Sequence, residues 1–290
     1  MRPTTIDLLR CLCGTGETLR VEETEADGGR ILHGALVCSV CGQRYPIEQG
    51  IARMLPPGLE AEAQKAASSE TLDPEEAAHK RREMAARDAQ VAHYDRMPGL
   101  ALFGRLEIPL TLAQMALRPE DTLLEAGCGT GRMTPIFAAR CRSMVAVDYS
   151  WESLRVCQNK LEAAGTSNVD LIQADACALP FRDGLFPKVV SCQVLEHIPT
   201  ADSRARMVAE MARVAQDGGD VVLSAYQHSW FTRLFGQKEG AHRGGIYFYR
   251  FSRPELNALL TPSLEVQRMT GALVYHYLAR CRKPFKEVNA

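Results

Sequence analysis

A glycine-rich segment and three acids carry the clearest chemistry in this 290-residue sequence. The segment Glu125-Ala126-Gly127-Cys128-Gly129-Thr130-Gly131 lies between a short apolar run and a helical pattern. Glycines in such a turn let a ligand approach the backbone closely. Asp148 ends the next apolar run, where a carboxylate can accept hydrogen bonds from both hydroxyls of a ribose. Asp175 follows the third run, where it could contact an adenine edge.

The glycine spacing narrows the type of ligand. A dinucleotide loop has the pattern G-x-G-x-x-G, and its third glycine would fall at position 132, which is Arg132. The pattern here is G-x-G-x-G preceded by an acid, and the chain has no G-x-x-x-x-G-K-[ST] phosphate loop. The sequence therefore predicts a nucleoside-like ligand without a pyrophosphate.

Short apolar runs alternate with amphipathic stretches from about residue 100 onward, and this alternation positions the loop and the acids. Repeated βα units predict a mainly parallel sheet with helices on both faces. Only Thr270-Gly271-Ala272 separates the last two runs, so they should form an antiparallel hairpin at the sheet edge. Ser252 and Glu255 have capping-box spacing and should open a helix. We expect strands over 122–125, 143–147, 169–173, 188–192, 220–225, 264–269 and 273–282, helices over 132–140, 151–164 and 203–214, and a turn at Gly218-Gly219.

Residues from about 100 to 282 resemble the class I S-adenosylmethionine-dependent methyltransferases, and within them the type 11-like group. The resemblance rests on the glycine segment and on Val145-Ala146-Val147-Asp148-Tyr149-Ser150, Gln173-Ala174-Asp175-Ala176, Leu179-Pro180-Phe181, Val194-Leu195-Glu196-His197-Ile198 and Gly218-Gly219. It implies an α/β fold with a Rossmann-like seven-stranded sheet, mostly parallel with an antiparallel edge hairpin. It also implies that S-adenosylmethionine is the cofactor.

The resemblance further assigns roles to residues. Glu125 and the glycine-loop backbone would face the methionine part, Asp148 would bind the ribose, and Gln193 would line the methyl-transfer face. Asp175 and Ala176 would bound the adenine. Pro187 departs from the pattern, because relatives usually have Asp there. His197 is a candidate catalytic base, with a structural role at a helix start as the alternative. The implied cofactor-binding set is Glu125, Gly127, Cys128, Gly129, Gly131, Asp148, Tyr149, Asp175, Ala176 and Gln193.

Four of the ten cysteines form two close pairs near the N-terminus, Cys11 with Cys13 and Cys38 with Cys41. In a reducing compartment such pairs suggest metal before disulfides, and four thiolates bind Zn²⁺ tetrahedrally. The first pair is one residue shorter than C-x-x-C, which leaves His33 as a substitute ligand and a metal-free ribbon as the alternative. Residues 38–51 resemble the short zinc-ribbon proteins that partner and activate tRNA and translation-factor methyltransferases. The N-terminal region is thus expected to be a small β-rich, zinc-ribbon-like module.

Composition divides the chain into three regions. Breaks at Pro56-Pro57-Gly58 and Met97-Pro98-Gly99 predict a zinc-ribbon-like module over 1–57, a helical linker over 58–98 and a methyltransferase domain over 99–290. The linker is rich in Ala and Glu without a strong apolar stripe, which favours an exposed or connecting helix. Hydrophobic residues make up 46% of the chain, an ordinary value for a globular protein. The net charge is −1, so we expect neither binding to nucleic acid by bulk charge nor a DNA partner. Neither a ~20-residue apolar run nor a secretory leader is visible, which favours a cytoplasmic location.

The acceptor is expected to meet the segment 227–245, which follows the fifth strand. Its aromatic side chains could line a pocket, stack on a base, touch a membrane surface or pack on their own core. Residues 227–290 carry ten basic and four acidic side chains, which suits RNA or an anionic substrate as well as a solvated face. The candidate substrate-loop residues are Trp230, Phe231, Phe235, His242 and Arg243.

Three functions remain open at this point, with protein methylation a minor fourth. The first is methyl transfer to a small-molecule or lipid-like acceptor. The second is methylation of an rRNA or tRNA base with the N-terminal module as docking element, which the absence of an Asn-Pro-Pro-Tyr-type motif at Gln193-Val194-Leu195-Glu196 makes less favoured. The third is a non-catalytic scaffold. The acceptor atom, the general base and the oligomeric state stay open.

Overall fold

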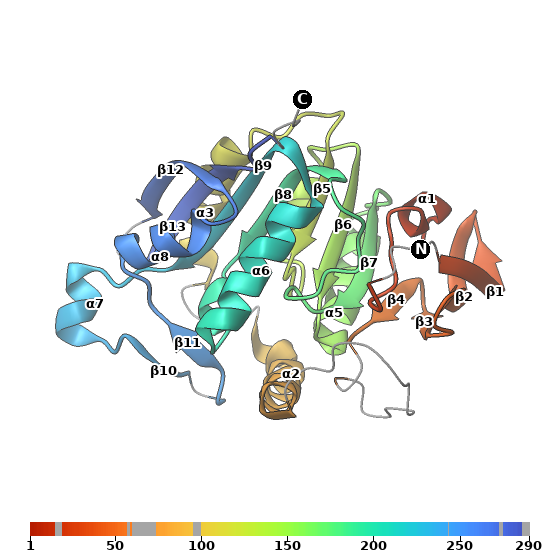
Figure 1. Cartoon of the computed structure of the whole chain (residues 1–290), viewed down its shortest axis with the longest axis horizontal. Coiled ribbons are helices and arrows are strands. Elements are labelled where there is room, and N and C mark those ends of the chain that lie inside the picture. The colour runs from red at the N-terminus through yellow and green to blue at the C-terminus, as the bar shows by residue number, and fades with distance from the viewer. Residues whose placement is uncertain are drawn as a thin grey trace.

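The architecture is a single large sheet flanked by helices. The computed structural model describes residues 1–14, 19–56, 59, 74–94, 100–242, 244–272 and 275–285. In these residues eleven strands form one sheet in the order β1-β2-β3-β4-β7-β6-β5-β8-β9-β13-β12, and β10 (Glu239–Ala241) and β11 (Tyr247–Tyr249) form a separate hairpin. Figure 1 shows the sheet from β1 at one end to β12 at the other.

Seven of these strands form the predicted Rossmann-like sheet. Strands β7, β6, β5, β8 and β9 are parallel to one another, whereas β13 is antiparallel to both β9 and β12. The α/β class and the antiparallel edge hairpin are therefore confirmed. The expected turn at Gly218-Gly219 lies inside a longer β9, beside a register shift against β8. The seven are β5 (Thr122–Ala126), β6 (Ser143–Asp148), β7 (Val169–Ala174), β8 (Phe186–Cys192), β9 (Ala215–Tyr226), β12 (Glu265–Ala272) and β13 (His276–Arg282).

The N-terminal module continues this sheet instead of forming a separate one. Its strands make an antiparallel meander, and β4 then pairs in parallel with β7, with Ala52 opposite Ile172 and Met54 opposite Ala174. The module consists of α1 (Pro3–Ile6), β1 (Leu19–Asp27), β2 (Arg30–Cys38), β3 (Arg44–Glu48) and β4 (Ile51–Met54). The module is β-rich as expected, but the sheet extends four strands beyond the predicted seven.

A buried carboxylate on β7 ties the module to the rest of the chain. Asp170 is 1% exposed. Its oxygens accept hydrogen bonds from Arg2 Nε at 2.6 Å, Thr5 Oγ1 at 2.5 Å and Arg30 Nη2 at 2.9 Å, all from the module. A buried charge is costly unless it is paired and hydrogen-bonded, so these contacts are needed where the module docks.

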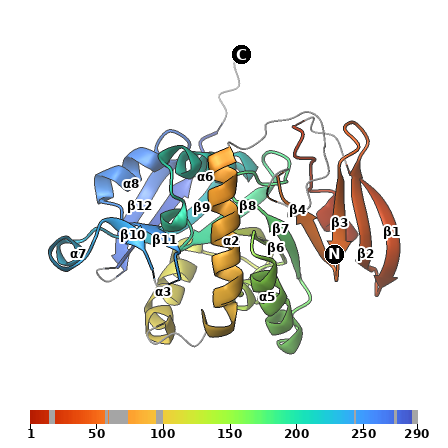
Figure 2. The ribbon, with the colours of Figure 1, turned by 90° about the horizontal axis from the view of Figure 1, so that it is seen from below.

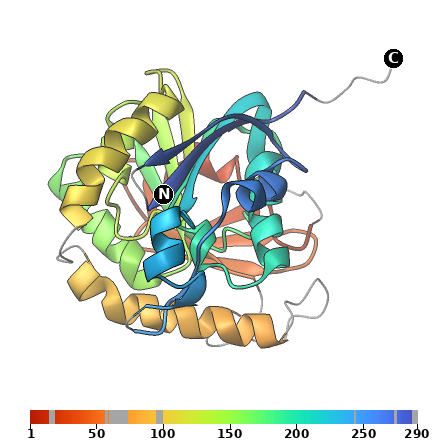
Figure 3. The same ribbon diagram turned by 90° about the vertical axis from the view of Figure 1, so that its left-hand side faces the viewer.

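Helices cover both faces of the sheet, as Figure 3 shows from the side. The described core has two large clusters, one that includes residues of α6 and α8 and one that includes residues of α3, α4 and α5, and a small third one that includes Ala77 of α2. Ser150 and Thr200 cap two of the helices, and Ser252 with Glu255 forms the predicted capping box. Within the described ranges no helix is long and apolar enough to cross a membrane. The helices are α3 (Leu100–Met115), α4 (Thr134–Ala138), α5 (Trp151–Ala163), α6 (Ala201–Val214) and α8 (Arg253–Leu260), with a 3₁₀ turn at Leu195–His197.

One long helix, α2 (Pro74–Tyr94), crosses the carboxyl ends of the parallel strands, as seen in Figure 2. The sequence predicted an exposed or connecting helix in this region. That expectation is wrong for one side of α2, where Ala77 is 5% and Lys80 8% exposed. Residues 58, 60–73 and 95–98 of the expected linker lie outside the described residues.

Candidate active site

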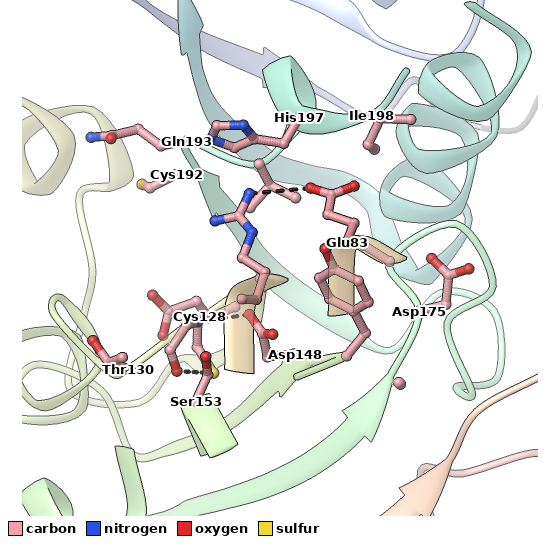
Figure 4. Close-up of a pocket in the computed structure, with 18 of the residues that line it drawn as sticks. Glu83, Cys128, Thr130, Asp148, Ser153, Asp175, Cys192, Gln193, His197 and Ile198 are labelled. Atoms are coloured by element: carbon pink, nitrogen blue, oxygen red, sulfur yellow. Dashed lines mark hydrogen bonds and ion pairs between the residues drawn. The ribbon is translucent and has the colours of Figure 1, made fainter. Parts of the chain in front are cut away.

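A cavity opens at the carboxyl ends of β5, β6, β7 and β8, beneath α2. It holds about 1170 Å³ of space, its open mouth included. Figure 4 shows side chains from the strand ends and from α2 converging on it. His197 and nine of the ten expected cofactor-binding residues line it, namely Glu125, Gly127, Cys128, Gly129, Asp148, Tyr149, Asp175, Ala176 and Gln193. Their binding role stays a prediction.

The glycine loop folds back onto β6. The backbone N–H groups of Gly127 and Cys128 both donate to the carbonyl of Val147, at 2.8 and 2.9 Å. Gly127 has φ +81°, and a Cβ there would lie 2.2 Å from the Val194 side chain. Gly131 does not line the cavity: a Cβ on it would lie 2.5 Å from Cys157 Sγ, so this glycine allows close packing on α5.

Asp148 links the loop to the start of α5. One carboxylate oxygen accepts from the Gly129 N–H at 2.8 Å and the other from the Ser150 N–H at 2.9 Å. Burial raises the pKa of this carboxyl above its usual value, and the two backbone hydrogen bonds oppose that rise. A carboxylate has about four acceptor sites, so each oxygen can also accept a hydroxyl from a ligand in the cavity.

Glu125, at the end of β5, is 3% exposed and accepts a hydrogen bond from Thr134 Oγ1 at 2.7 Å. Burial raises the pKa of this carboxyl to about 7. A positively charged ligand group in the cavity would favour the ionised form and lower this pKa.

Asp175 already has a charged partner from α2. Its carboxylate accepts from the Cys177 N–H at 2.8 Å and from Lys80 Nζ at 2.6 Å, and Lys80 also lies 3.0 Å from Glu76. Burial acts to lower the pKa of Lys80, but Asp175, Cys177 and Glu76 together outweigh it and the pKa is raised. This ion pair holds α2 over the cavity.

The contribution of α2 was missed in the sequence. The residues that line the cavity follow helical spacing and so share one face of the helix. Because four of the five are charged or polar, they give no apolar stripe, although their helical spacing is a signal that could have been used to predict this face. They are Lys80, Glu83, Arg87, Gln90 and Val91.

A second missed residue, Glu107 of α3, supports the wall of the cavity that Gln193 forms. Glu107 is 3% exposed and accepts hydrogen bonds from Gln193 Nε2 at 2.5 Å and Arg132 Nη2 at 2.9 Å. Gln193 itself has φ +58°, a left-handed conformation that non-glycine residues seldom adopt. Such strain tends to concentrate at functional sites.

His197 presents a neutral imidazole to the cavity. Its Nδ1 lies 2.7 Å from the carbonyl oxygen of Tyr247, so Nδ1 carries the proton and donates it to that carbonyl. Burial lowers the pKa of His197 well below its ordinary value, so Nε2 remains an acceptor. The rings of Tyr226 and His242 lie 5.6 and 5.9 Å from the His197 ring.

Three of the expected substrate-loop residues, Trp230, Phe231 and His242, are not among the described residues that line the cavity. Trp230 and Phe231 are exposed on the short helix α7 (Trp230–Phe235), whereas His242 packs on Phe248 with ring centroids 4.7 Å apart. Arg243 and the side chain of Phe235 lie outside the described residues.

The four N-terminal cysteines come together as a possible metal centre. The sulfur atoms of Cys11, Cys13, Cys38 and Cys41 all lie within 4.8 Å of one another. Two measured separations, 3.6 Å for Cys11 to Cys41 and 3.9 Å for Cys13 to Cys38, bracket the roughly 3.8 Å edge of a tetrahedral ZnS₄ site. His33 lies instead beside Glu25. The donor set and its geometry fit Zn²⁺.

Two family models match the chain. One, for a methyltransferase domain, matches residues 124–223, and the other, for Trm112p-like proteins, matches residues 2–50. The chain is 31% identical over 180 residues to a demethylmenaquinone methyltransferase from Geobacillus stearothermophilus, covering 60% of this chain and 72% of that protein. It is 37% identical over 102 residues to a phosphatidylethanolamine N-methyltransferase from Cereibacter sphaeroides, covering 35% of this chain and 48% of that protein. Several further curated relatives are likewise matched over about half of their length.

A solved complex between the Haloferax volcanii Trm112 methyltransferase activator and a putative methyltransferase has the same fold. The match has a TM-score of 0.53 at 16% identity and covers 68% of this chain and 97% of the matched chain. The fold and the cavity at the strand ends define a Rossmann-like methyltransferase with a Trm112p-like N-terminal module. The chain belongs to the methyltransferase family.

Proposed function

We propose that this protein transfers a methyl group from S-adenosylmethionine to a small-molecule or lipid-like acceptor. The observation that carries the proposal is the roof over the cavity: α2 crosses the strand ends and is held there by Lys80 and Asp175. A roofed cavity suits a small or chain-like acceptor better than a structured nucleic acid. Relatives named for methylation of a quinone and of a phospholipid support the same class.

The lining residues suit the cofactor. Asp148 would accept the ribose hydroxyls on the oxygen lone pairs left over from its two backbone hydrogen bonds. Asp175 and Ala176 would bound the adenine, and Tyr149 would lie beside the ribose. Glu125 would face the methionine part together with the backbone of Gly127, Cys128 and Gly129.

The chain's own contribution to methyl transfer would be orientation and proton removal. When bound, the sulfonium of the cofactor supplies the electrophilic methyl group. Gln193, fixed by Glu107 and Ser224, would line the path of the incoming acceptor atom. His197 would accept a proton on Nε2 where the acceptor must lose one, because its Nδ1 is committed to Tyr247.

The N-terminal module would act within the chain as an activator-like subunit. It would bind one Zn²⁺ through Cys11, Cys13, Cys38 and Cys41 and support β7, which carries Asp175 just beyond its end. In this proposal the module stabilises the cofactor site from behind and does not itself bind the acceptor.

Label transfer tests the function. The purified protein would be incubated with methyl-labelled S-adenosylmethionine and an extract from cells that lack it, and the RNA, protein and solvent-extractable fractions would be counted. We expect label in the solvent-extractable fraction. Label in RNA alone would favour base methylation, and cofactor binding without transfer to any fraction would contradict the proposed acceptor class.

Asp148→Ala is the matched inactive control. Loss of hydrogen bonds to a charged group should weaken S-adenosylhomocysteine binding about 10- to 100-fold in calorimetry, without unfolding the chain. Asp27→Ala, an exposed aspartate in the module, should leave the affinity unchanged. An unchanged affinity for Asp148→Ala would remove this residue from the cofactor site.

A further inference from the structure

The helix α7 has an inverted burial pattern. Its polar residues face inward, with Ser229 at its N-cap and Thr232 each 5% exposed. Its apolar residues face outward, with Trp230 68%, Leu234 70% and Phe231 37% exposed. Figures 1 and 2 show α7 projecting from the end of the molecule opposite the N-terminal module.

Four exposed side chains gather on this short helix, and we call them the α7 tip, defined as Trp230, Phe231, Arg233 and Leu234. Positions 230, 231 and 234 lie on one helical face by their spacing. Tyr275 adjoins it, since its backbone carbonyl accepts from the Gln227 N–H at 2.6 Å and its side chain is 41% exposed. Isolated exposed apolar residues are common, but clustered ones rimmed by polar residues mark interaction sites.

The charge around the tip is positive in a chain whose net charge is −1. Residues 227–253 contain five Lys or Arg and one acidic residue, Glu239. Arg233 is exposed on α7 itself, while Lys238 pairs with Glu255 and Arg250 stacks on Phe248. Burial and then Arg233 and Lys238 lower the pKa of His228, which shows that these charges share one neighbourhood.

We propose that the α7 tip docks reversibly into the interface of an anionic lipid bilayer. Trp, Phe and Leu side chains enter the boundary between headgroups and acyl chains, and the surrounding Arg and Lys side chains attract anionic headgroups. A helix of six residues attaches only weakly by itself, so binding depends both on insertion of the apolar side chains and on attraction of the basic side chains to anionic headgroups. The net positive charge of this segment selects a lipid surface over an uncharged partner protein.

The tip is connected directly to the cavity wall. The chain leaves α7 into the β10–β11 hairpin, and Tyr247 in β11 accepts the hydrogen bond from His197. Gly244 and Tyr247 also face Arg82 of α2 across a small second cavity. A bilayer bound at the tip therefore lies at one end of a continuous segment that ends beside His197. The bilayer would supply the lipid-like acceptor of the proposed function. The docking proposal rests on the proposed function for this role, whereas binding to the bilayer can be tested without it.

Vesicle binding tests the proposal. The full chain would be sedimented with vesicles of phosphatidylcholine alone and with vesicles that also contain phosphatidylglycerol. We expect binding to the anionic vesicles that weakens with added salt, and a blue shift of Trp230 emission in a Trp151→Phe background, which leaves Trp230 as the sole tryptophan. Trp230→Ser combined with Leu234→Ser should reduce binding about tenfold or more.

Two control variants match the test in chemistry and exposure. Phe285→Ser removes an aromatic ring that is 74% exposed beside Gly218, near the start of β9, whereas α7 follows the other end of that strand. Arg118→Glu reverses a charge distant from the tip and is compared with Arg233→Glu. Both controls should bind vesicles like the unchanged protein, whereas Arg233→Glu should not.

The outcomes separate this proposal from the proposed function. Absent binding to anionic vesicles, binding that survives the tip variants, or equal binding to uncharged vesicles would overturn the docking proposal. Sedimentation with RNA in place of vesicles would assign the tip to nucleic acid and overturn it too. Calorimetry with S-adenosylhomocysteine on the same samples reports the cofactor site independently, so loss of either property is seen without the other.

Discussion

At the scale of single residues, the cavity keeps several ionisable groups in unusual states. Glu125 has a pKa of about 7, and His197 has a pKa well below its ordinary value. Burial is the first cause in both cases. The cavity therefore holds a carboxyl with a raised pKa beside a neutral imidazole, and a cationic ligand group would lower the pKa of Glu125.

Cofactor affinity should rise with pH as Glu125 ionises. Below its pKa the carboxyl must lose a proton before it can pair with a cationic ligand group, so binding of S-adenosylhomocysteine should strengthen about tenfold between about pH 6 and about pH 8. Calorimetry in buffers of different ionisation enthalpy measures both the affinity and the released proton. Glu125→Gln should bind with little pH dependence, and a slope that persists in this variant would place the titration elsewhere.

The raised pKa of Glu125 also makes the free energy of unfolding depend on pH. In the unfolded chain the Glu125 carboxyl has its ordinary pKa of 4.5, whereas in the folded chain its pKa is about 7. The folded state therefore binds more protons in this window, and the contribution of Glu125 to the free energy of unfolding decreases as pH rises through it.

At the scale of elements, α2 depends on one buried ion pair. Lys80→Met would leave the Asp175 carboxylate with the Cys177 N–H but no cation, and removing one partner of a buried pair should cost up to about 3 kcal/mol. We expect faster hydrogen exchange across α2 and weaker retention of S-adenosylhomocysteine. The exposed neighbour Arg81 provides the matched control, since Arg81→Met should leave both unchanged. Equal exchange in the two variants would show that Lys80 does not hold the roof.

The βα elements could be predicted from sequence because each depends on local chemistry. The strand β6 is an apolar run ended by Asp148, α5 begins at a Ser150 cap, and three residues between two runs leave no room for a crossover. The roof over the cavity could not be predicted in this way. The cavity-facing side of α2 is mostly polar, and the sequence around Lys80 or Glu107 does not indicate which distant residue each one contacts.

At the scale of the whole molecule, the metal site and the sheet support each other. Bound zinc would fix the module, and the module supplies β4 to β7 and hydrogen-bond donors from three residues to Asp170. We expect the purified chain to contain about one zinc ion, and chelation to lower the melting temperature by several degrees while weakening cofactor binding. Metal analysis and thermal unfolding with and without chelator measure both effects.

Cysteine variants provide the control for zinc removal. Cys38→Ser combined with Cys41→Ser should reproduce the effect of the chelator, whereas Cys141→Ser, in the other core cluster, should keep the metal. A chain that contains no metal and is insensitive to chelation would support the metal-free ribbon.

The pairing of β4 with β7 marks the limit of prediction at this scale. The cysteine spacing and the sequence from Cys38 to Ile51 indicated a ribbon-like module, and the structure confirms a β-rich one. Nothing in Ile51–Met54 specifies a partner strand more than a hundred residues away, because parallel pairing leaves no local periodicity beyond that of any buried strand. The domain boundaries at 57 and 98 stay predictions.

Covalent continuity changes how the module and the catalytic part associate. In a two-chain complex the fraction assembled falls on dilution, whereas here β4 and β7 belong to one chain and meet at the effective concentration of a tethered pair. Assembly is therefore independent of how much of this protein a cell makes. A free activator-type protein of the same fold would find the β7 edge already occupied and could enter only by displacing β4 of this chain.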